Sequence, residues 1–331
     1  MSTKKDKFSN KDKIFMQLAL NLAKARHGLT GINPSVGCVI VRNNKILSIG
    51  QTGFDGTPHA EFNAIKNSNE NLEGSKMYVT LEPCSHYGKT PPCTNIIIKN
   101  KIKEVVYAVE DIDKKVKGKT LKILKSKNIL VKKNLLKKEI NKFYTSYFFN
   151  RKNNLPFVTG KIAISRNNLI YSKGTKRISD IHTDKFTHFL RYKNDSLMIS
   201  SKTLKKDNPK LNCRLEGLNK FSPKRIILDK NLETKKNSYI FKTANKNNTI
   251  IFYHNAETKV KLMFKKKGIT LIKGKLDKDN FDIKSILKKL YVLDCRNLLV
   301  EGGNNLSKHI IKKRLFNEFY LYKCVKSLSK L

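Results

Sequence analysis

Three potential metal ligands and one carboxylate occur in the order of a hydrolytic zinc site. His59 and Glu61 are separated by a single residue. Cys84 follows Glu61 by 23 positions, and Cys93 follows Cys84 by nine. One imidazole and two thiolates leave the fourth tetrahedral position of zinc open for water. A carboxylate two residues from the His can shuttle a proton without binding the metal. The order H-x-E … P-C … C is typical of enzymes that replace an exocyclic amine on a heterocycle with oxygen.

Each part of this pattern has an ordinary alternative. A His-Ala-Glu run at a helix start is usually a surface group, and a Cys pair is often two buried thiols. The combination favours zinc. Cys38 has apolar neighbours and is expected in a core. His86 lies between the two Cys ligands, where a substrate contact and a solvated loop both remain open. Three cysteines have no partner at ligand spacing and are expected to be structural: Cys213, Cys295 and Cys324.

A layered α/β domain is expected to position the four site residues. Apolar periodicity predicts helices over 12–27, 59–67, 95–100 and 118–127, and strands over 36–41, 45–50, 77–81 and 104–109. Alternating strands and helices imply an α/β/α structure. Both metal-bearing segments then fall at strand-to-helix junctions, where backbone N–H groups and the helix dipole lower a thiol's pKa.

The polar stretch 151–156 predicts a boundary between a deaminase domain over 1–152 and a second domain over 153–331. Strands in the second domain are expected over 157–165, 196–200, 225–229, 249–253, 268–272, 297–301 and 319–323. Helices between some of them predict another α/β domain. The polar segment 231–248 is expected to be a loop.

Composition bounds the number of domains, the class of partner and the cellular compartment. A chain of 331 residues favours two domains. The net charge of +43 suggests nucleic-acid binding, but only 10 of the 69 basic residues are Arg and they are spread along the chain. Solvated Lys therefore explains the charge better than a nucleic-acid site. We find no apolar run long enough to span a membrane and no secretory signal. Six sparse cysteines fit a reducing cytoplasm.

The loop between the two cysteines narrows the substrate class. Eight residues separate Cys84 from Cys93 in PCSHYGKTPPC, whereas deaminases of tRNA adenosine or cytidine typically have two. With Asn33-Pro34, the run VGCVIV at 36–41 and TLEPC at 80–84, the chain resembles the bifunctional riboflavin-biosynthesis deaminase–reductase over nearly its whole length. The resemblance implies a cytidine-deaminase-like domain followed by a dihydrofolate-reductase-like domain. It also implies Zn²⁺, NADPH and the substrate 2,5-diamino-6-(5-phosphoribosylamino)pyrimidin-4-one.

The resemblance also implies roles for single residues. Glu61 would be catalytic, and His59, Cys84 and Cys93 would bind the metal. In the reductase half, substrate contacts would be made by Thr175, Arg191, Leu211, Arg214 and Glu301. NADPH contacts would be made by Ile164, Arg177, Thr203, Asp207, Gly303, Asn304, Asn305 and Leu306.

The second half departs from the family at three places. Residues 165–168 read Ser-Arg-Asn-Asn where the family has an S-x-D-G turn, and Arg177 replaces a Trp. The chain also ends at Leu331, sooner than family members, which predicts a shortened domain. These departures predict weak or missing NADPH-dependent reduction, while deamination proceeds. One alternative is a deaminase whose second domain is a non-catalytic assembly module. A nucleic-acid base deaminase is less favoured, and a homo-oligomer is compatible with the sequence.

Overall fold

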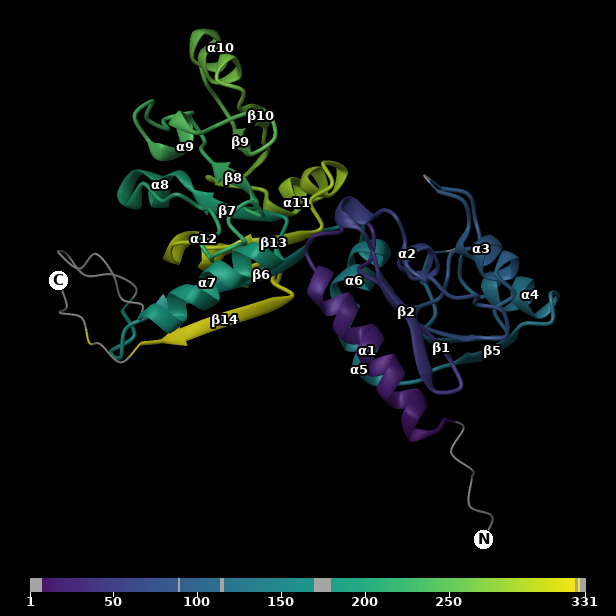
Figure 1. Cartoon of the computed structure of the whole chain (residues 1–331). Helices are drawn as coiled ribbons and strands as arrows, with labels where there is room; N and C mark the ends of the chain where they lie inside the picture. Colours follow the sequence, from purple (N-terminus) through teal and green to yellow (C-terminus); the bar gives the residue numbers. More distant parts are fainter. Residues whose placement is uncertain (1–7, 89, 114–115, 170–179, 325–326, 328–331) are drawn as a thin grey trace. The chain divides into compact units, whose positions relative to one another are not determined.

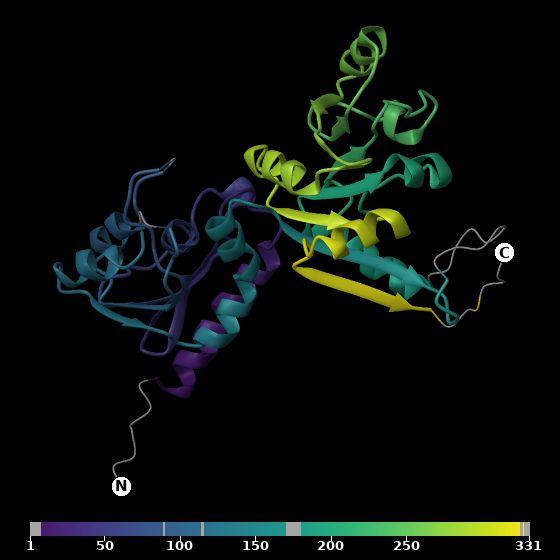
Figure 2. The same cartoon turned by 180° about the vertical axis from the view of Figure 1, so that it is seen from behind.

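In a computed structural model, the chain forms two compact units, residues 1–153 and 154–331, coloured purple to teal and teal to yellow in Figures 1 and 2. The structure describes residues 8–88, 90–113, 116–169, 180–324 and 327. No helix among these residues is both long enough and apolar enough to cross a bilayer. Each unit is built on one main sheet with helices around it, so the predicted α/β class is confirmed.

The N-terminal unit is a five-stranded sheet between two helical layers. Its strands are β1 (Gly37–Arg42), β2 (Lys45–Gln51), β3 (Lys76–Leu81), β4 (Glu104–Val109) and β5 (Leu130–Lys133), in the order β2-β1-β3-β4-β5. Helices α1 (Asn10–Arg26), α5 (Lys137–Phe143) and α6 (Thr145–Asn153) lie together on one face of this sheet. The other face carries α2 (Ala60–Lys66), α3 (Cys93–Lys99) and α4 (Lys119–Lys125), and a short helix, η1 (Phe54–Gly56), precedes α2.

Local sequence explains how this sheet holds the metal-bearing helix. Asn43 and Asn44 have positive φ angles of 50° and 63°, which a tight hairpin turn needs, and they join β1 to β2. A Cβ on Gly50 would lie 2.2 Å from the carbonyl oxygen of Ala60. Only glycine therefore lets α2 pack directly on β2, and that packing fixes the start of α2. Cys38 is fully buried in the core of this unit, as expected.

The C-terminal unit has a seven-stranded, entirely parallel sheet. Its strands are β6 (Phe157–Ile164), β7 (Ser196–Ser200), β8 (Lys224–Leu228), β9 (Thr249–Tyr253), β10 (Thr270–Lys273), β13 (Asn297–Val300) and β14 (Glu318–Lys323), in the order β10-β9-β8-β7-β13-β6-β14. A small separate hairpin is formed by β11 (Leu276–Asp277) and β12 (Asn280–Phe281). The helices are α7 (Ile181–Lys193), α8 (Ser201–Asp207), α9 (Tyr239–Lys242), α10 (Thr258–Lys266), α11 (Ile283–Val292) and α12 (Asn304–Lys312).

The central strands of this sheet are buried on both faces, because their side chains alternate between two cores. In β7, Leu197 and Ile199 join the core under α7 to α10, while Met198 joins the core under α11 and α12. In β13, Leu299 joins the core under α7 to α10, and Leu298 joins the core under α11 and α12. Strands buried on both faces read as continuous apolar runs. For this reason the strands of the second half were predictable from sequence.

Two local details differ from the sequence-based expectation. Segment 231–248 is not entirely loop, since α9 lies inside it and buries Ile240 and Phe241. The turn at 165–168 closes without glycine, because Asn168 takes a φ of 64° and its N–H donates to the carbonyl of Ser165 over 3.0 Å. Asparagine tolerates this left-handed conformation better than other residues with a Cβ. The substitution therefore preserves the turn.

Candidate functional site

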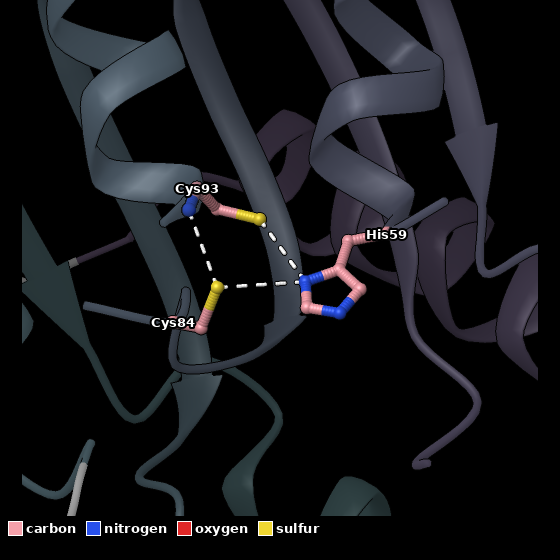
Figure 3. A group of neighbouring side chains, drawn as sticks. All are labelled: His59, Cys84 and Cys93. Carbon is pink, nitrogen blue, oxygen red and sulfur yellow. Dashed lines mark hydrogen bonds between the residues drawn. The ribbon is translucent and has the colours of Figure 1, made fainter. Parts of the chain in front are cut away.

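The three predicted metal ligands converge at the starts of two helices (Figure 3). His59 is the residue before α2, Cys93 is the first residue of α3, and Cys84 lies three residues after β3. His59 Nδ1 lies 3.3 Å from the Sγ of Cys93 and 3.4 Å from the Sγ of Cys84. Tetrahedral zinc with usual bond lengths holds N and S ligands about 3.5 Å apart. One imidazole nitrogen and two sulfurs at these separations fit zinc.

The surroundings of Cys84 favour its thiolate form. The backbone N–H of Cys93 donates to the Sγ of Cys84 over 3.2 Å. Hydrogen bonding from the Cys93 thiol, opposed by burial and assisted by His59, lowers the pKa of Cys84 to about 4. Because a thiolate is the form that binds metal, the site is prepared for a cation.

Glu61 is a buried carboxylate beside these ligands. It lies in the first turn of α2 and is 4% exposed. Burial, assisted by the nearby Cys84 thiolate and opposed by His59, raises the pKa of Glu61 to about 7. A carboxylate with such a pKa can both accept and return a proton near neutral pH.

A cavity of about 270 Å³ is lined by His59, Cys84 and Glu61. Asn33 and Pro34 form part of its wall. The Asn33 side chain donates to the carbonyl of Gly56 over 3.0 Å, which ties the segment before β1 to the segment before α2. His86 also lines this cavity, and its buried Nδ1 has no hydrogen-bond partner among the described residues. The structure therefore places His86 on the cavity wall, which favours the first of the two alternatives that the sequence left open.

Sequence reasoning missed the part of the wall that comes from α6. Tyr147 and Arg151 project from this helix into the cavity lining, together with Asp111 from the end of β4. The Tyr147 hydroxyl donates to the Asp111 carboxylate over 3.2 Å. No motif marks these residues, and Arg151 was assigned only to the domain boundary. Their role arises from packing between segments far apart in sequence.

In the C-terminal unit, the structure joins two of the predicted substrate residues in an ion pair. Arg191 of α7 donates to both carboxylate oxygens of Glu301, over 2.6 and 2.7 Å. Burial opposes ionisation of Glu301, but the guanidinium of Arg191 outweighs it and lowers the carboxyl pKa. Arg191 also donates to the carbonyl of Asn212, whose side chain accepts from Arg214. Arg191, Arg214 and Glu301 therefore belong to one polar cluster.

His188 lies in the same cluster, although its sequence context gave no reason to select it. The backbone N–H of Arg214 donates to His188 Nδ1 over 3.2 Å. Burial and the positive charges of Arg191 and Arg214 lower the pKa of His188 to about 4, so the ring is neutral near pH 7. Lys161 of β6 faces the same carboxylate: burial lowers its pKa, and Glu301 opposes this shift.

Most of the predicted NADPH contacts that the structure describes lie at or shortly after the carboxyl ends of β6, β7 and β13, and α/β folds bind ligands at this edge of the sheet. Thr203 in α8 lies near Gly303, the residue that precedes α12, because a Cβ on Gly303 would be 3.4 Å from its hydroxyl. Asn304 and Asn305 form the exposed first turn of α12, and Ile164 ends β6. Leu306 is buried under α12 and Asp207 ends α8.

The other predicted contacts are Leu211, Thr175 and Arg177. Leu211 is 2% exposed and packs in an apolar core, so its side chain does not offer a surface to a ligand. Its φ of 54° instead bends the backbone toward Asn212. Thr175 and Arg177 lie outside the described residues.

Comparisons with known protein families match both units. Residues 9–109 match the model of the cytidine and deoxycytidylate deaminase zinc-binding region, and residues 160–326 match the RibD C-terminal domain. The riboflavin biosynthesis protein RibD of Aquifex aeolicus is 34% identical over 313 residues, which cover 94% of this chain and 86% of that protein. The diaminohydroxyphosphoribosylamino-pyrimidine deaminase of Buchnera aphidicola is 43% identical over 146 residues, covering 44% of this chain and 99% of that protein.

Solved structures match over nearly the full length. RibD of Acinetobacter baumannii superposes with a TM-score of 0.86 at 27% identity, covering 97% of this chain and 88% of that one. The diaminohydroxyphosphoribosylaminopyrimidine deaminase/5-amino-6-(5-phosphoribosylamino)uracil reductase of Thermotoga maritima gives a TM-score of 0.82 at 30% identity, with the same coverage.

Proposed function

We infer the roles of single residues from one premise: the chain belongs to the RibD family, the bifunctional deaminase/reductase of riboflavin biosynthesis. Its N-terminal half is a zinc-dependent deaminase and its C-terminal half an NADPH-dependent reductase. We propose that the deaminase half acts on 2,5-diamino-6-(5-phosphoribosylamino)pyrimidin-4-one. The observation that carries this proposal is the convergence of one imidazole nitrogen and two sulfurs beside a buried carboxylate in one cavity.

In this proposal His59, Cys84 and Cys93 hold the zinc ion. A zinc ion held there would supply the Lewis acidity that activates a water molecule for attack on the ring carbon bearing the 2-amino group. The chain must move two protons. Glu61 would accept the first from the attacking water and pass it to a ring nitrogen, and it would then carry the second from the added oxygen to the departing amine, so that ammonia leaves. Its burial and its raised pKa suit both steps.

The reaction of the reductase half would convert the ribosyl chain of the deaminated product to a ribityl chain, with the hydride supplied by bound NADPH. We propose that residues at the carboxyl edge of the sheet would hold the nicotinamide nucleotide, and the N-terminus of α12 would favour its negatively charged phosphates. Arg191, Arg214 and Glu301 would hold the phosphorylated substrate beside it. The pair Arg191–Glu301 keeps both charges in a fixed geometry, which is what positioning a reactant requires.

Two rival functions lead to different measurements. If the second unit is only an assembly module, the chain will deaminate its substrate but will not bind NADPH. If the chain is a nucleic-acid base deaminase, an RNA oligonucleotide will compete with the nucleotide. Incubating the chain with the diaminopyrimidine phosphate, with and without NADPH, and identifying the products separates all three functions.

The free thiols of the metal site also favour a reducing compartment such as the cytoplasm.

The pyrimidine nucleotide is expected to be deaminated about a hundredfold or more faster than cytidine or a tRNA adenosine. The reason is the cavity wall, which Asn33, Pro34 and the eight-residue loop between Cys84 and Cys93 shape. Ammonia release at equal enzyme concentration checks this. Comparable rates on an RNA oligonucleotide would favour the nucleic-acid rival instead.

Replacing Glu301 by Gln is expected to slow NADPH oxidation with the deaminated intermediate by about tenfold or more, because it removes the charge that fixes Arg191. Deamination by the same variant should be unchanged, since Glu301 lies in the other compact unit. The exposed Glu257, changed to Gln, is the matched control. Equal NADPH oxidation by both variants would show that Glu301 has no role in the reductase site. If the unmodified chain oxidises no NADPH, the sequence-based expectation of weak reduction is confirmed.

A further inference from the structure

We propose that Arg151 recognises the phosphate of the deaminase substrate and so selects the phosphorylated nucleotide over its dephosphorylated form. This inference rests on the proposed deamination, because it concerns the same cavity. It adds a specificity residue from α6, the last helix of the N-terminal unit. No motif and no ligand spacing pointed to that helix.

The guanidinium of Arg151 is held in place by two different elements. Its Nη2 donates to the carbonyl of Ile32 over 3.2 Å, and its central carbon lies 5.3 Å from the centre of the Tyr147 ring. Ile32 immediately precedes Asn33 and Pro34, so Arg151 is anchored to the segment that also forms the cavity wall. An anchored guanidinium presents its N–H fork in a fixed direction, which suits two-point binding of a phosphate.

Arg151 differs in charge from the other charged residues that line the cavity. Among the described residues that line it, carboxylates are numerous: Asp55, Glu61, Glu82, Asp111 and Asp113. Of these described lining residues, Arg151 is the one with a permanent positive charge. A doubly charged phosphate entering so acidic a cavity needs a compensating cation, and Arg151 is the group positioned to supply it.

Asp111 is the acid that would oppose this role, and its carboxylate is already engaged by hydrogen bonds from other groups. It is 7% exposed, accepts a hydrogen bond from the Tyr147 hydroxyl, and accepts a second from the backbone N–H of Asp113 over 2.9 Å. Burial raises the pKa of Asp111, while Tyr147 and Arg151 lower it. Arg151 itself is half-buried. The cation is therefore more open to solvent than the carboxylate that neighbours it.

The test compares two substrates on one variant. Arg151→Gln removes the charge and leaves a polar side chain that ends two bonds short of the Nη2 atom bonded to Ile32. We expect kcat/KM for deamination of the phosphorylated diaminopyrimidine to fall about tenfold to a hundredfold, with a change below about threefold for the dephosphorylated riboside. Ribose 5-phosphate should inhibit the unmodified chain more strongly than ribose, and this difference should vanish in the variant. Lys152→Ala, an exposed change on the same helix, is the matched control and should alter neither substrate.

Zinc content and melting temperature show whether each variant is folded. Should Arg151→Gln be unstable, Arg151→Lys keeps the charge without the fork, and it should retain part of the preference for the phosphorylated substrate. An equal loss on both substrates would overturn the inference, because it would mean that Arg151 only holds α6 against Ile32. If the unmodified chain releases ammonia from neither compound, the proposed deamination fails and the inference falls with it.

Discussion

Alanine at Cys84 or at Cys93 is expected to remove zinc and deamination together. Each substitution leaves two protein ligands where structural and catalytic zinc sites have at least three. The loss of zinc affinity should be greater than the loss of one ligand alone would cause, because each cysteine also helps to position the other ligands. Cys93 also donates its backbone N–H to the Sγ of Cys84, and both sulfurs contact His59 Nδ1.

Metal analysis of the purified protein checks this expectation. The unmodified chain should carry about one zinc per molecule. Cys38→Ala is the matched control, since Cys38 is buried in the same unit and lies in the core of the sheet. This variant should keep both its zinc and its activity. Full zinc occupancy in the Cys84 and Cys93 variants would exclude these residues as ligands.

Replacing Glu61 by Gln is expected to leave zinc bound while turnover falls by about a hundredfold or more. Glutamine keeps the size of the side chain and its place in the first turn of α2. It cannot accept the proton that the attacking water must lose, however, and it cannot pass that proton to the amine. A variant that keeps its zinc but loses turnover would identify Glu61 as a proton carrier and not as a metal ligand.

Ammonia release and zinc content, measured on the same preparation, provide this comparison. Glu73→Gln is a suitable control, because Glu73 is an exposed carboxylate that pairs with Lys101 at the surface. That variant should match the unmodified chain in both measurements. Near-normal ammonia release from Glu61→Gln would place the proton transfer on another group.

The metal ligands could be predicted because their chemistry is local. His59 and Glu61 begin one helix, and Cys84 and Cys93 bound one loop, so residue type and spacing already describe most of the site. The fold class and the buried strands were also predictable, since β7 and β13 are apolar on both faces.

What escaped prediction depends on contacts between distant segments. Tyr147 and Arg151 join the cavity only because α6 packs beside the segment before β1. His188 joins the Arg191 cluster through the bend at Leu211, which no periodicity reveals. Helix α9 lies in a polar stretch whose two buried side chains are too few to give an apolar pattern.

The strand order of the second sheet has a consequence for the time course of folding. β6 is the first strand of its unit, yet its two neighbours are β13 and β14, which are synthesised last. The N-terminal unit, by contrast, forms its contacts within residues 1–153. During translation the zinc-binding half can therefore fold before β6 can pair, because β13 and β14 lie about 140 and about 160 residues downstream. Such long-range parallel pairing is slow and leaves apolar strand surface exposed. We expect the reductase half to be the part that needs chaperones and the first to aggregate when expression is fast.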